Sequence, residues 1–186
     1  QVHPAVRLGD EVEAARRLAV GQLMRVVLRF QEAMGEEIPN LSFAGFLLSD
    51  EPVFPTWWTP LSVRAPFITG WSAGPHADSL LARPQDYVIS QAVDALIRIT
   101  RSDPLRVASL LEAAYFHDWH ADPFSLGAYS YTPAHALAAR AALAEPISQT
   151  LYFAGEATDT AGHSATVHGA IASGKRAANQ ILAADR

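Results

Sequence analysis

Two neighbouring features near the C-terminus combine residue types that can bind and act on a ligand. Glu156 follows Gly155 directly after the apolar run Thr150–Ala154, which has the pattern of a short buried strand. A helical pattern then opens at Thr166 and Val167. A carboxylate at a strand end accepts hydrogen bonds from ligand hydroxyls, and the unpaired amides of a helix N-terminus favour an anionic or carbonyl-bearing group. We therefore expect a ligand site at this edge of a sheet.

Two glycines inside the expected final helix need an explanation. Gly169 and Gly174 each cost a helix roughly 1 kcal/mol relative to alanine. Close approach of a ligand or of a backbone segment is one explanation, and tight packing of helix against sheet is the other. Glu156 has an ordinary alternative as well, because most glutamates lie in solvated loops.

Other catalytic and metal-binding chemistries have little support. The chain has no cysteine, which excludes disulfides, thiolate catalysis and cysteine-based metal sites. His117 and His120 are three residues apart but lack a Glu-x-x-His or His-x-x-x-His pattern, so no metal site is predicted. A Ser-His-Asp triad has no supporting Gly-x-Ser-x-Gly segment.

Composition excludes further classes of protein. With 186 residues, 49% of them hydrophobic, the chain can bury the core of one compact domain or of parts of two. The net charge is −5 and no basic run exceeds Arg16–Arg17, which disfavours a nucleic-acid surface. No apolar run reaches the ~20 residues of a membrane span. The start, from Gln1 to Pro4, has no initiator methionine and no signal pattern, so we expect the true N-terminus to be missing and assign no compartment beyond a cytoplasmic default.

Short apolar runs in the first half of the chain predict an antiparallel sheet. Leu23–Phe30 reads as a strand, and turn-forming residues separate three more runs at Leu41–Leu48, Phe54–Trp58 and Pro66–Trp71. A short helix is expected before them, at Asp10–Leu18.

Helical spacing dominates the second half. A helix is expected from Pro84 to the stop at Asp103, and another at Ala134–Leu143, whereas Val107–Trp119 fits helix and strand equally well. In the final helix one face is apolar and faces away from Lys175, Arg176 and Asn179. The predicted apolar face comprises Val167, Ala170, Ile171, Gly174, Ala178, Ile181 and Leu182.

The segment Leu151–Gly174 (LYFAGEATDTAGHSATVHGAIASG) resembles the C-terminal flavin-contacting signature of the FAD-dependent amine oxidases. That family includes monoamine oxidases, polyamine oxidases and lysine-specific histone demethylases. Upstream, Trp119–Thr132 (WHADPFSLGAYSYT) is similar to a second family segment, and Phe54–Gly74 and Leu23–Phe30 match more loosely.

The resemblance implies an α+β fold in two portions. Residues 1–134 would form part of a substrate-binding domain, a mixed, largely antiparallel sheet flanked by helices. Residues 135–186 would form a β–loop–α unit of the FAD-binding domain. The Rossmann half of that domain carries Gly-x-Gly-x-x-Gly, and no Gly-x-Gly occurs in this chain. We expect such a chain to expose a sheet edge and a flavin groove through which it can associate.

The resemblance also implies cofactor-binding residues. Gly155 and Glu156 would lie at the ribityl region of FAD, with the Glu156 carboxylate accepting its hydrogen bonds. Thr166 and Val167 would lie against the isoalloxazine ring, and Trp119 would pack near it. The physical chemistry agrees, because reduced flavin carries negative charge that a helix N-terminus stabilises by about 1 kcal/mol.

Two catalytic residues and the mode of flavin binding follow from the same resemblance. Tyr129 would face the substrate amine, and Thr166 takes the place of a second tyrosine of the monoamine oxidases. Ala128 replaces their flavin-linking cysteine, so the FAD would be non-covalent. Gapless pairing back from Phe30 puts Glu11 where many members have a lysine that holds a water at the flavin.

The implied reaction is hydride transfer from the carbon of a small amine to flavin, with hydrolysis of the resulting imine and reoxidation of the flavin by O₂. Two alternatives stay open: a non-catalytic relic or partner module without cofactor, and a flavin oxidoreductase acting on another substrate class. The isolated chain is expected to turn over little or no substrate, since the ADP-binding motif is absent.

Overall fold

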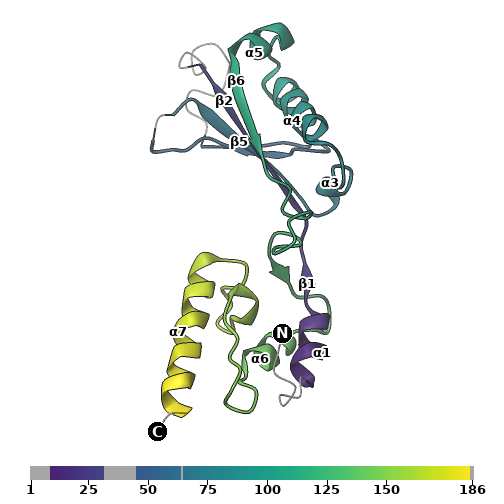
Figure 1. Cartoon of the computed structure of the whole chain (residues 1–186). Helices are drawn as coiled ribbons and strands as arrows, with labels where there is room; N and C mark the ends of the chain where they lie inside the picture. Colours follow the sequence, from purple (N-terminus) through teal and green to yellow (C-terminus); the bar gives the residue numbers. More distant parts are fainter. Residues whose placement is uncertain (1–8, 32–44, 64, 185–186) are drawn as a thin grey trace. The chain divides into compact units, whose positions relative to one another are not determined.

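The structure is a computed structural model, and it describes residues 9–31, 45–63 and 65–184 (Figure 1). The chain divides into two compact units. Unit 1 consists of Gln1–Gly21 and Ala128–Arg186, and unit 2 consists of Gln22–Gly127. The expected boundary at residue 134 separated functional portions, whereas these units place the N-terminal helix with the C-terminal residues. The assignment of substrate and flavin binding to the two parts stays a prediction.

Unit 2 is built on a five-stranded antiparallel sheet with the order β3-β4-β5-β2-β6. The strand β2 (Leu23–Phe30) is central and alternates buried and more exposed side chains, as the period of a half-buried strand requires. It pairs with β5 and β6, and the short strands β4 and β3 extend the β5 side. Their bounds are β3 Phe46–Leu48, β4 Thr56–Trp58, β5 Phe67–Ala73 and β6 Leu111–Phe116.

Helices line one face of this sheet (Figure 1). They are α3 (Pro75–Asp78), α4 (Gln85–Thr100) and α5 (Pro104–Leu110). Between helices and sheet lies a hydrophobic core whose largest fully buried side chains include Trp57, Phe30 and Phe54. Burial of these side chains is the main favourable term in the folding of unit 2.

Most of the expected elements of unit 2 are confirmed. The strand at Leu23–Phe30 has the expected bounds, and the helix after Pro84 ends at Thr100. The ambiguous stretch Val107–Trp119 contains both structures, because α5 ends at Leu110 and β6 begins at the next residue. Of the run Leu41–Leu48, the first four residues lie outside the described part of the chain.

Unit 1 contains helices and one small two-stranded sheet. The strand β1 (Ala19–Val20) pairs antiparallel with β7 (Ser130–Tyr131), which joins the two stretches of chain that form the unit. The helix α1 packs on α6 through the buried residues Ala14 and Ala139. The remaining bounds are α1 Asp10–Arg17, α6 Ala139–Ala144, the 3₁₀ turn η1 Glu156–Thr158 and α7 Val167–Ala184.

Two expected elements of unit 1 were wrong in type or length. Thr150–Ala154 forms no strand: its one ladder contact is a bridge between Leu151 and Ile147. A strand needs a neighbour for its backbone groups, and here the Phe153 carbonyl accepts a hydrogen bond from the Arg176 side chain instead. The helix expected at Ala134–Leu143 begins only at Ala139, because His135 has a positive φ of 64° that interrupts a helix.

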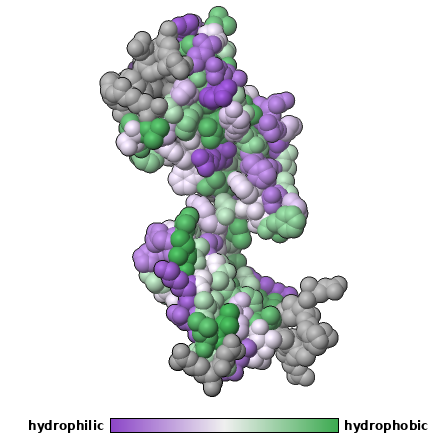
Figure 2. All heavy atoms as spheres, turned by 60° about the vertical axis from the view of Figure 1, so that its left-hand side comes forward, coloured by the Kyte–Doolittle hydropathy of each residue, from purple (hydrophilic) through white to green (hydrophobic). Residues whose placement is uncertain are grey.

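The buried face of α7 also differs from the expected one. Val167, Ile171 and Leu182 are 77%, 56% and 63% exposed, whereas Gly169, Ser173 and Ala177 are buried. The segment packed against α7 offers backbone groups that need partners, so polar and small residues turn towards it. Figure 2, in which the side of the molecule bearing α7 is turned forward, shows strongly apolar residues at the surface of unit 1.

Candidate functional site

The Glu156 carboxylate is the centre of a hydrogen-bonded cluster in unit 1. Its Oε1 accepts from the Ser130 amide at 2.7 Å, and its Oε2 accepts from the Ser130 hydroxyl at 2.9 Å and from the Ala165 amide at 2.7 Å. Glu156 therefore connects strand β7 with Ala165, which precedes the N-cap residue of α7. These bonds exclude the ordinary alternative for Glu156, a glutamate in a solvated loop.

Arg140 lies behind this carboxylate and is almost fully buried, with 9% of its side chain exposed. Its Nη1 donates to the Ser130 hydroxyl at 2.8 Å and to the Ala157 carbonyl at 3.2 Å, and its Nε donates to the Thr132 hydroxyl at 2.8 Å. The distance from Nη1 to Glu156 Oε2 is 3.9 Å, so the two opposite charges compensate one another.

Thr166 closes the first turn of α7. Its hydroxyl donates to the His163 carbonyl at 2.5 Å and accepts from the Gly169 amide at 3.1 Å, which is the bonding of a helix N-cap. Gly169 is needed for this turn, because a Cβ there would lie 2.1 Å from the His163 carbonyl oxygen. Of the two glycines, Gly169 thus serves close backbone approach, whereas Gly174 has open space beside it.

The start of α7 has unpaired donors. In the part of the chain that the structure describes, the amides of Val167 and His168 have no hydrogen-bond acceptor, and the Val167 side chain is 77% exposed. Ala165, which precedes the cap, has a φ of 62°. Two free amides and the positive end of the helix dipole make this turn able to receive a carbonyl or an anion.

Gly155 and Tyr129 belong to the same unit. Gly155 has a φ of 137°, which favours glycine, and its amide donates to the Ser173 hydroxyl at 2.9 Å. Tyr129 is 36% exposed and immediately precedes Ser130, and its carbonyl accepts from the Gly21 amide at 2.8 Å. Five of the six expected site residues therefore lie in unit 1.

Trp119, the sixth expected site residue, lies in unit 2 and is 45% exposed. Its ring meets that of His117 edge to face, with centroids 4.3 Å apart. His117 Nε2 in turn lies 3.4 Å from Asp122 Oδ2. The backbone amide of Phe124, followed by that of Ser125 and by the His117 ring, holds the pKa of the Asp122 carboxyl below its ordinary value.

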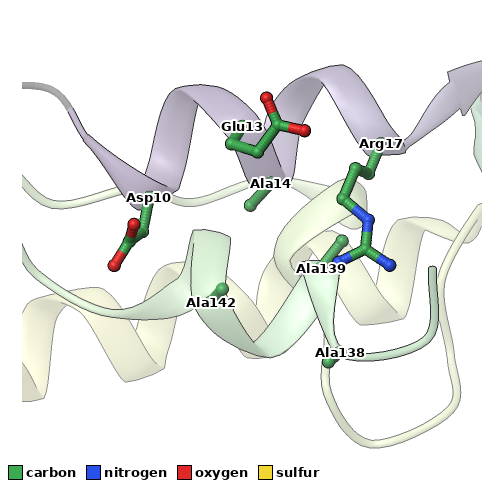
Figure 3. Close-up of a pocket in the computed structure, with 7 residues that line it drawn as sticks. All are labelled: Asp10, Glu13, Ala14, Arg17, Ala138, Ala139 and Ala142. Atoms are coloured by element: carbon green, nitrogen blue, oxygen red, sulfur yellow. The ribbon is translucent and has the colours of Figure 1, made fainter.

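Three further features of unit 1 complete the description. Asp10, Glu13 and Arg17 of α1 surround a hollow floored by alanines of α6 (Figure 3). Glu11, the counterpart of the family lysine in the gapless pairing, is half-buried in α1. Among the described residues, no group of three or more His, Cys, Asp or Glu side chains could hold a metal ion.

Sequence reasoning missed two cations that form hydrogen bonds inside unit 1, the half-buried Arg176 and the buried Arg140. Arg176 was expected on the solvent side of α7, but it donates to the carbonyls of Ala144 and Phe153 and to the Thr158 hydroxyl. Arg140 was not singled out at all. One signal could have found it: Arg140 is the only charged residue in the otherwise apolar segment ARAALA of α6, where a charge needs buried partners.

Comparison with protein families settles the relationship of the chain. The model of the family described as flavin containing amine oxidoreductase matches residues 2–182. The chain belongs to this family. The match covers both units, so the flavin-containing amine oxidoreductase family accounts for the sheet of unit 2 as well as for the Leu151–Gly174 segment.

Curated relatives of this amine oxidoreductase chain carry histone demethylase names. It is 31% identical over 187 residues to histone demethylase-like protein A of Aspergillus fumigatus, covering 91% of this chain and 16% of that protein. It is 29% identical over 174 residues to lysine-specific histone demethylase 1 homolog 3 of Arabidopsis thaliana, covering 90% and 10%. The chain thus spans 10–16% of the length of these two relatives.

Solved structures agree on the fold. A redesigned putrescine oxidase superposes with a TM-score of 0.78 at 15% identity, over 97% of this chain and 39% of that one. A second variant of a redesigned putrescine oxidase gives a TM-score of 0.76 at 16% identity. The α+β fold expected from the sequence is confirmed. Among the described residues, no helix is both long enough and apolar enough to cross a membrane.

Proposed function

We propose that the protein containing this chain is an FAD-dependent amine oxidase, and that unit 1 supplies its contacts to the flavin ring. The family match over residues 2–182 supports the reaction class. The observation that carries the site is the open start of α7, where the Val167 and His168 amides lack acceptors among the described residues beside an exposed Val167 side chain.

The residues at this turn fit a flavin ring. The two amides would face the carbonyl edge of the ring, where negative charge gathers on reduction, and the helix dipole would favour that charge by about 1 kcal/mol. The chemistry that FAD supplies when bound is oxidation of the amine to an imine, with O₂ as the final electron acceptor. The Thr166 hydroxyl is engaged by the cap, so we assign Thr166 to holding the turn rather than to proton transfer.

Glu156 has limited capacity for the cofactor. A carboxylate offers about four acceptor positions, and three hydrogen bonds within unit 1 already use Glu156. One position is left for a ribityl hydroxyl. Gly155 allows the close backbone approach of such a ligand, since nothing lies within 4 Å of a Cβ placed there.

The substrate is an amine that meets an aromatic surface. The partly exposed Tyr129 ring offers a face that attracts an ammonium group. The relatives named for histone demethylation make an N-methylated lysine side chain the first amine to test. The role of Trp119 near the flavin stays a prediction, as does non-covalent attachment of the FAD, for which Ala128 is the reason.

Anaerobic titration of the flavin-loaded protein tests this proposal. We expect an N-methylated lysine peptide, or a diamine as an alternative amine, to bleach the flavin absorbance, and O₂ to restore it with release of H₂O₂. Bound flavin that no amine reduces would instead identify an oxidoreductase for another substrate class. A colourless protein that takes up no FAD would identify a non-catalytic module.

A second measurement concerns the 186 residues alone. We expect them to bind FAD weakly and to show little turnover, because they contain no Gly-x-Gly motif for the ADP half. Tight, stoichiometric FAD binding by these residues would contradict that expectation.

A further inference from the structure

Arg140 forms several hydrogen bonds in the cluster around Glu156. Its guanidinium reaches two other segments, through the hydroxyls of Ser130 and Thr132 at β7 and the carbonyl of Ala157 in η1. It is the charged residue of an otherwise apolar helix, and 91% of its side chain is removed from solvent. Burying a charge costs free energy unless the charge is paired and hydrogen-bonded, so these contacts offset the cost of burying Arg140.

The Ser130 hydroxyl transmits the effect of Arg140 to Glu156. A serine hydroxyl has one proton to donate, and its oxygen can accept from other donors. Because Arg140 Nη1 donates to this oxygen at 2.8 Å, the serine proton is free to point at Glu156 Oε2, 2.9 Å away. Arg140 therefore sets the direction of the Ser130 hydrogen bond and also offsets the charge of the carboxylate.

Glu156 in turn fixes the backbone just before α7. Its Oε2 accepts from the Ala165 amide at 2.7 Å, and Ala165 has a φ of 62°, a left-handed conformation that is unfavourable for alanine. A hydrogen bond to a charged acceptor is strong enough to hold such a residue. Ala165 immediately precedes Thr166, so its conformation determines where the Val167 and His168 amides point.

We infer that Arg140 is a positioning residue for flavin binding, which acts through Ser130 and Glu156 to hold Ala165 and the first turn of α7. This inference rests on the proposed function, because it concerns the turn that we propose faces the flavin. It also gives Glu156 a different main role, that of a clamp between β7 and α7 that leaves only one acceptor position for the cofactor.

The test compares Arg140→Met with two control variants of unit 1. Amide hydrogen exchange of the 186-residue chain, followed by NMR, should show the hydrogen-bonded amides of Ala165 and Gly169 exchanging roughly tenfold faster in Arg140→Met, with smaller changes in the rest of α7. Arg16→Met replaces an exposed arginine of α1 and should leave both amides unchanged. Arg176→Met removes contacts along α7 and should speed exchange throughout that helix.

The second readout is the dissociation constant of FAD in the flavin-loaded protein. We expect Arg140→Met to weaken FAD binding roughly tenfold and Glu156→Gln to weaken it similarly, with the double variant no worse than either single variant, because the two residues act in one network. Additive losses, or unchanged affinity in Arg140→Met, would overturn the inference.

The two readouts separate this inference from the proposed function. If the wild-type protein binds no flavin, the proposed function fails, and selective exchange at Ala165 still decides whether Arg140 positions the turn. Uniformly faster exchange across unit 1 would show that Arg140 stabilises the unit as a whole, and this would overturn the inference. Should Arg140→Met fail to fold, Ser130→Ala decides: it keeps the Ser130 amide bond to Glu156, and we expect the same selective pattern at a smaller factor.

Discussion

The two units of this chain are held together by different interactions. In unit 2 the largest fully buried side chains are aromatic and aliphatic, among them Trp57, Phe30 and Phe54. In unit 1 the buried apolar residues are alanines and Ile147, while five of the eight buried polar or charged residues of the described chain lie there. Those five are Ser130, Arg140, Thr158, Asp159 and Ser173.

The two units therefore differ in the kinds of substitution that destabilise them. Unit 2 depends on apolar burial, which is non-directional and tolerates small shifts. Unit 1 depends on directional hydrogen bonds from the buried Arg140 and the half-buried Arg176. It leaves Val167, Ile171 and Leu182 of α7 exposed. We therefore expect the loss of one hydrogen-bonding side chain to destabilise unit 1 more than unit 2. The proposed site lies in unit 1, the unit that buries fewer large apolar side chains.

All four tryptophans of the chain lie in unit 2, which allows the two units to be followed separately. Tryptophan fluorescence reports the unfolding of unit 2 alone. Amide exchange of α7 reports the stability of unit 1. The first two predictions below use these signals to test the contrast between the units.

The largest effect is expected from truncating the core of unit 2. Phe54 is fully buried and its ring lies 6.0 Å from that of Trp57. Phe54→Ala should lower the free energy of unfolding by about 3–5 kcal/mol, because it removes a buried aromatic ring and leaves a cavity. Urea denaturation followed by tryptophan fluorescence measures this loss.

Phe124→Ala is the matched control in the same unit, since Phe124 is 96% exposed. Its effect should stay within about 0.5 kcal/mol. Equal losses in the two variants would mean that the core of unit 2 is not where the structure places it.

The next largest effect is expected in unit 1. Arg176 Nη1 donates to the Ala144 carbonyl at 2.6 Å, and its Nη2 donates to the Phe153 carbonyl at 2.9 Å. Arg176→Met removes the donor to the Phe153 carbonyl and the shorter bond to the Ala144 carbonyl, which keeps Gln180 Nε2 at 3.5 Å, and it should destabilise α7 by about 2–3 kcal/mol. Faster exchange along α7, with an unchanged tryptophan transition, is the expected observation.

Lys175→Met provides the comparison, because Lys175 is the exposed neighbour on the same helix. It should leave exchange along α7 nearly unchanged. A loss in Lys175→Met as large as that in Arg176→Met would show that charge, and not the buried hydrogen bonds, stabilises the helix.

A pair of glycine variants on α7 is expected to act in opposite directions. Gly169→Ala places a Cβ 2.1 Å from the His163 carbonyl oxygen, so it should destabilise the first turn by about 1–3 kcal/mol. Gly174→Ala meets open space and should stabilise the helix by up to about 1 kcal/mol. Thermal unfolding by circular dichroism checks both signs, and stabilisation by both variants would refute the close approach at His163.

The smallest effect concerns an exposed loop of unit 2. Hydrogen bonds from the Phe124 and Ser125 amides and from His117 lower the pKa of Asp122, so its NMR titration should have a midpoint below the ordinary aspartate value. Because the pKa of Asp122 is lower in the folded state than in the unfolded chain, the ionised carboxylate stabilises the fold. This stabilisation is fully present above the pKa of the unfolded chain and is lost as pH falls through the folded pKa. His117→Ala should move the midpoint up by part of the shift; no movement would remove His117 as a cause.

Local patterns predicted most of unit 2 but less of unit 1. The alternation in Leu23–Phe30 and the helical spacing after Pro84 were sufficient, because each buries one face against a large apolar core. Thr150–Ala154 looked equally like a strand, yet its backbone groups have other partners. Periodicity could not identify Arg140, because a hydrogen-bonded cluster of residues far apart in sequence leaves no periodic signal.

The family was recognisable from the sequence, since the order of residues in Leu151–Gly174 is readable without coordinates. The buried face of α7 and the hydrogen-bond partners of Glu156 became known only from the fold. The physical reason is that apolar side chains gain by burial against any apolar surface, whereas buried carbonyls and carboxylates require particular donors at particular distances. Those donors, Arg176 and Ser130, come from chain segments that only the fold brings within reach.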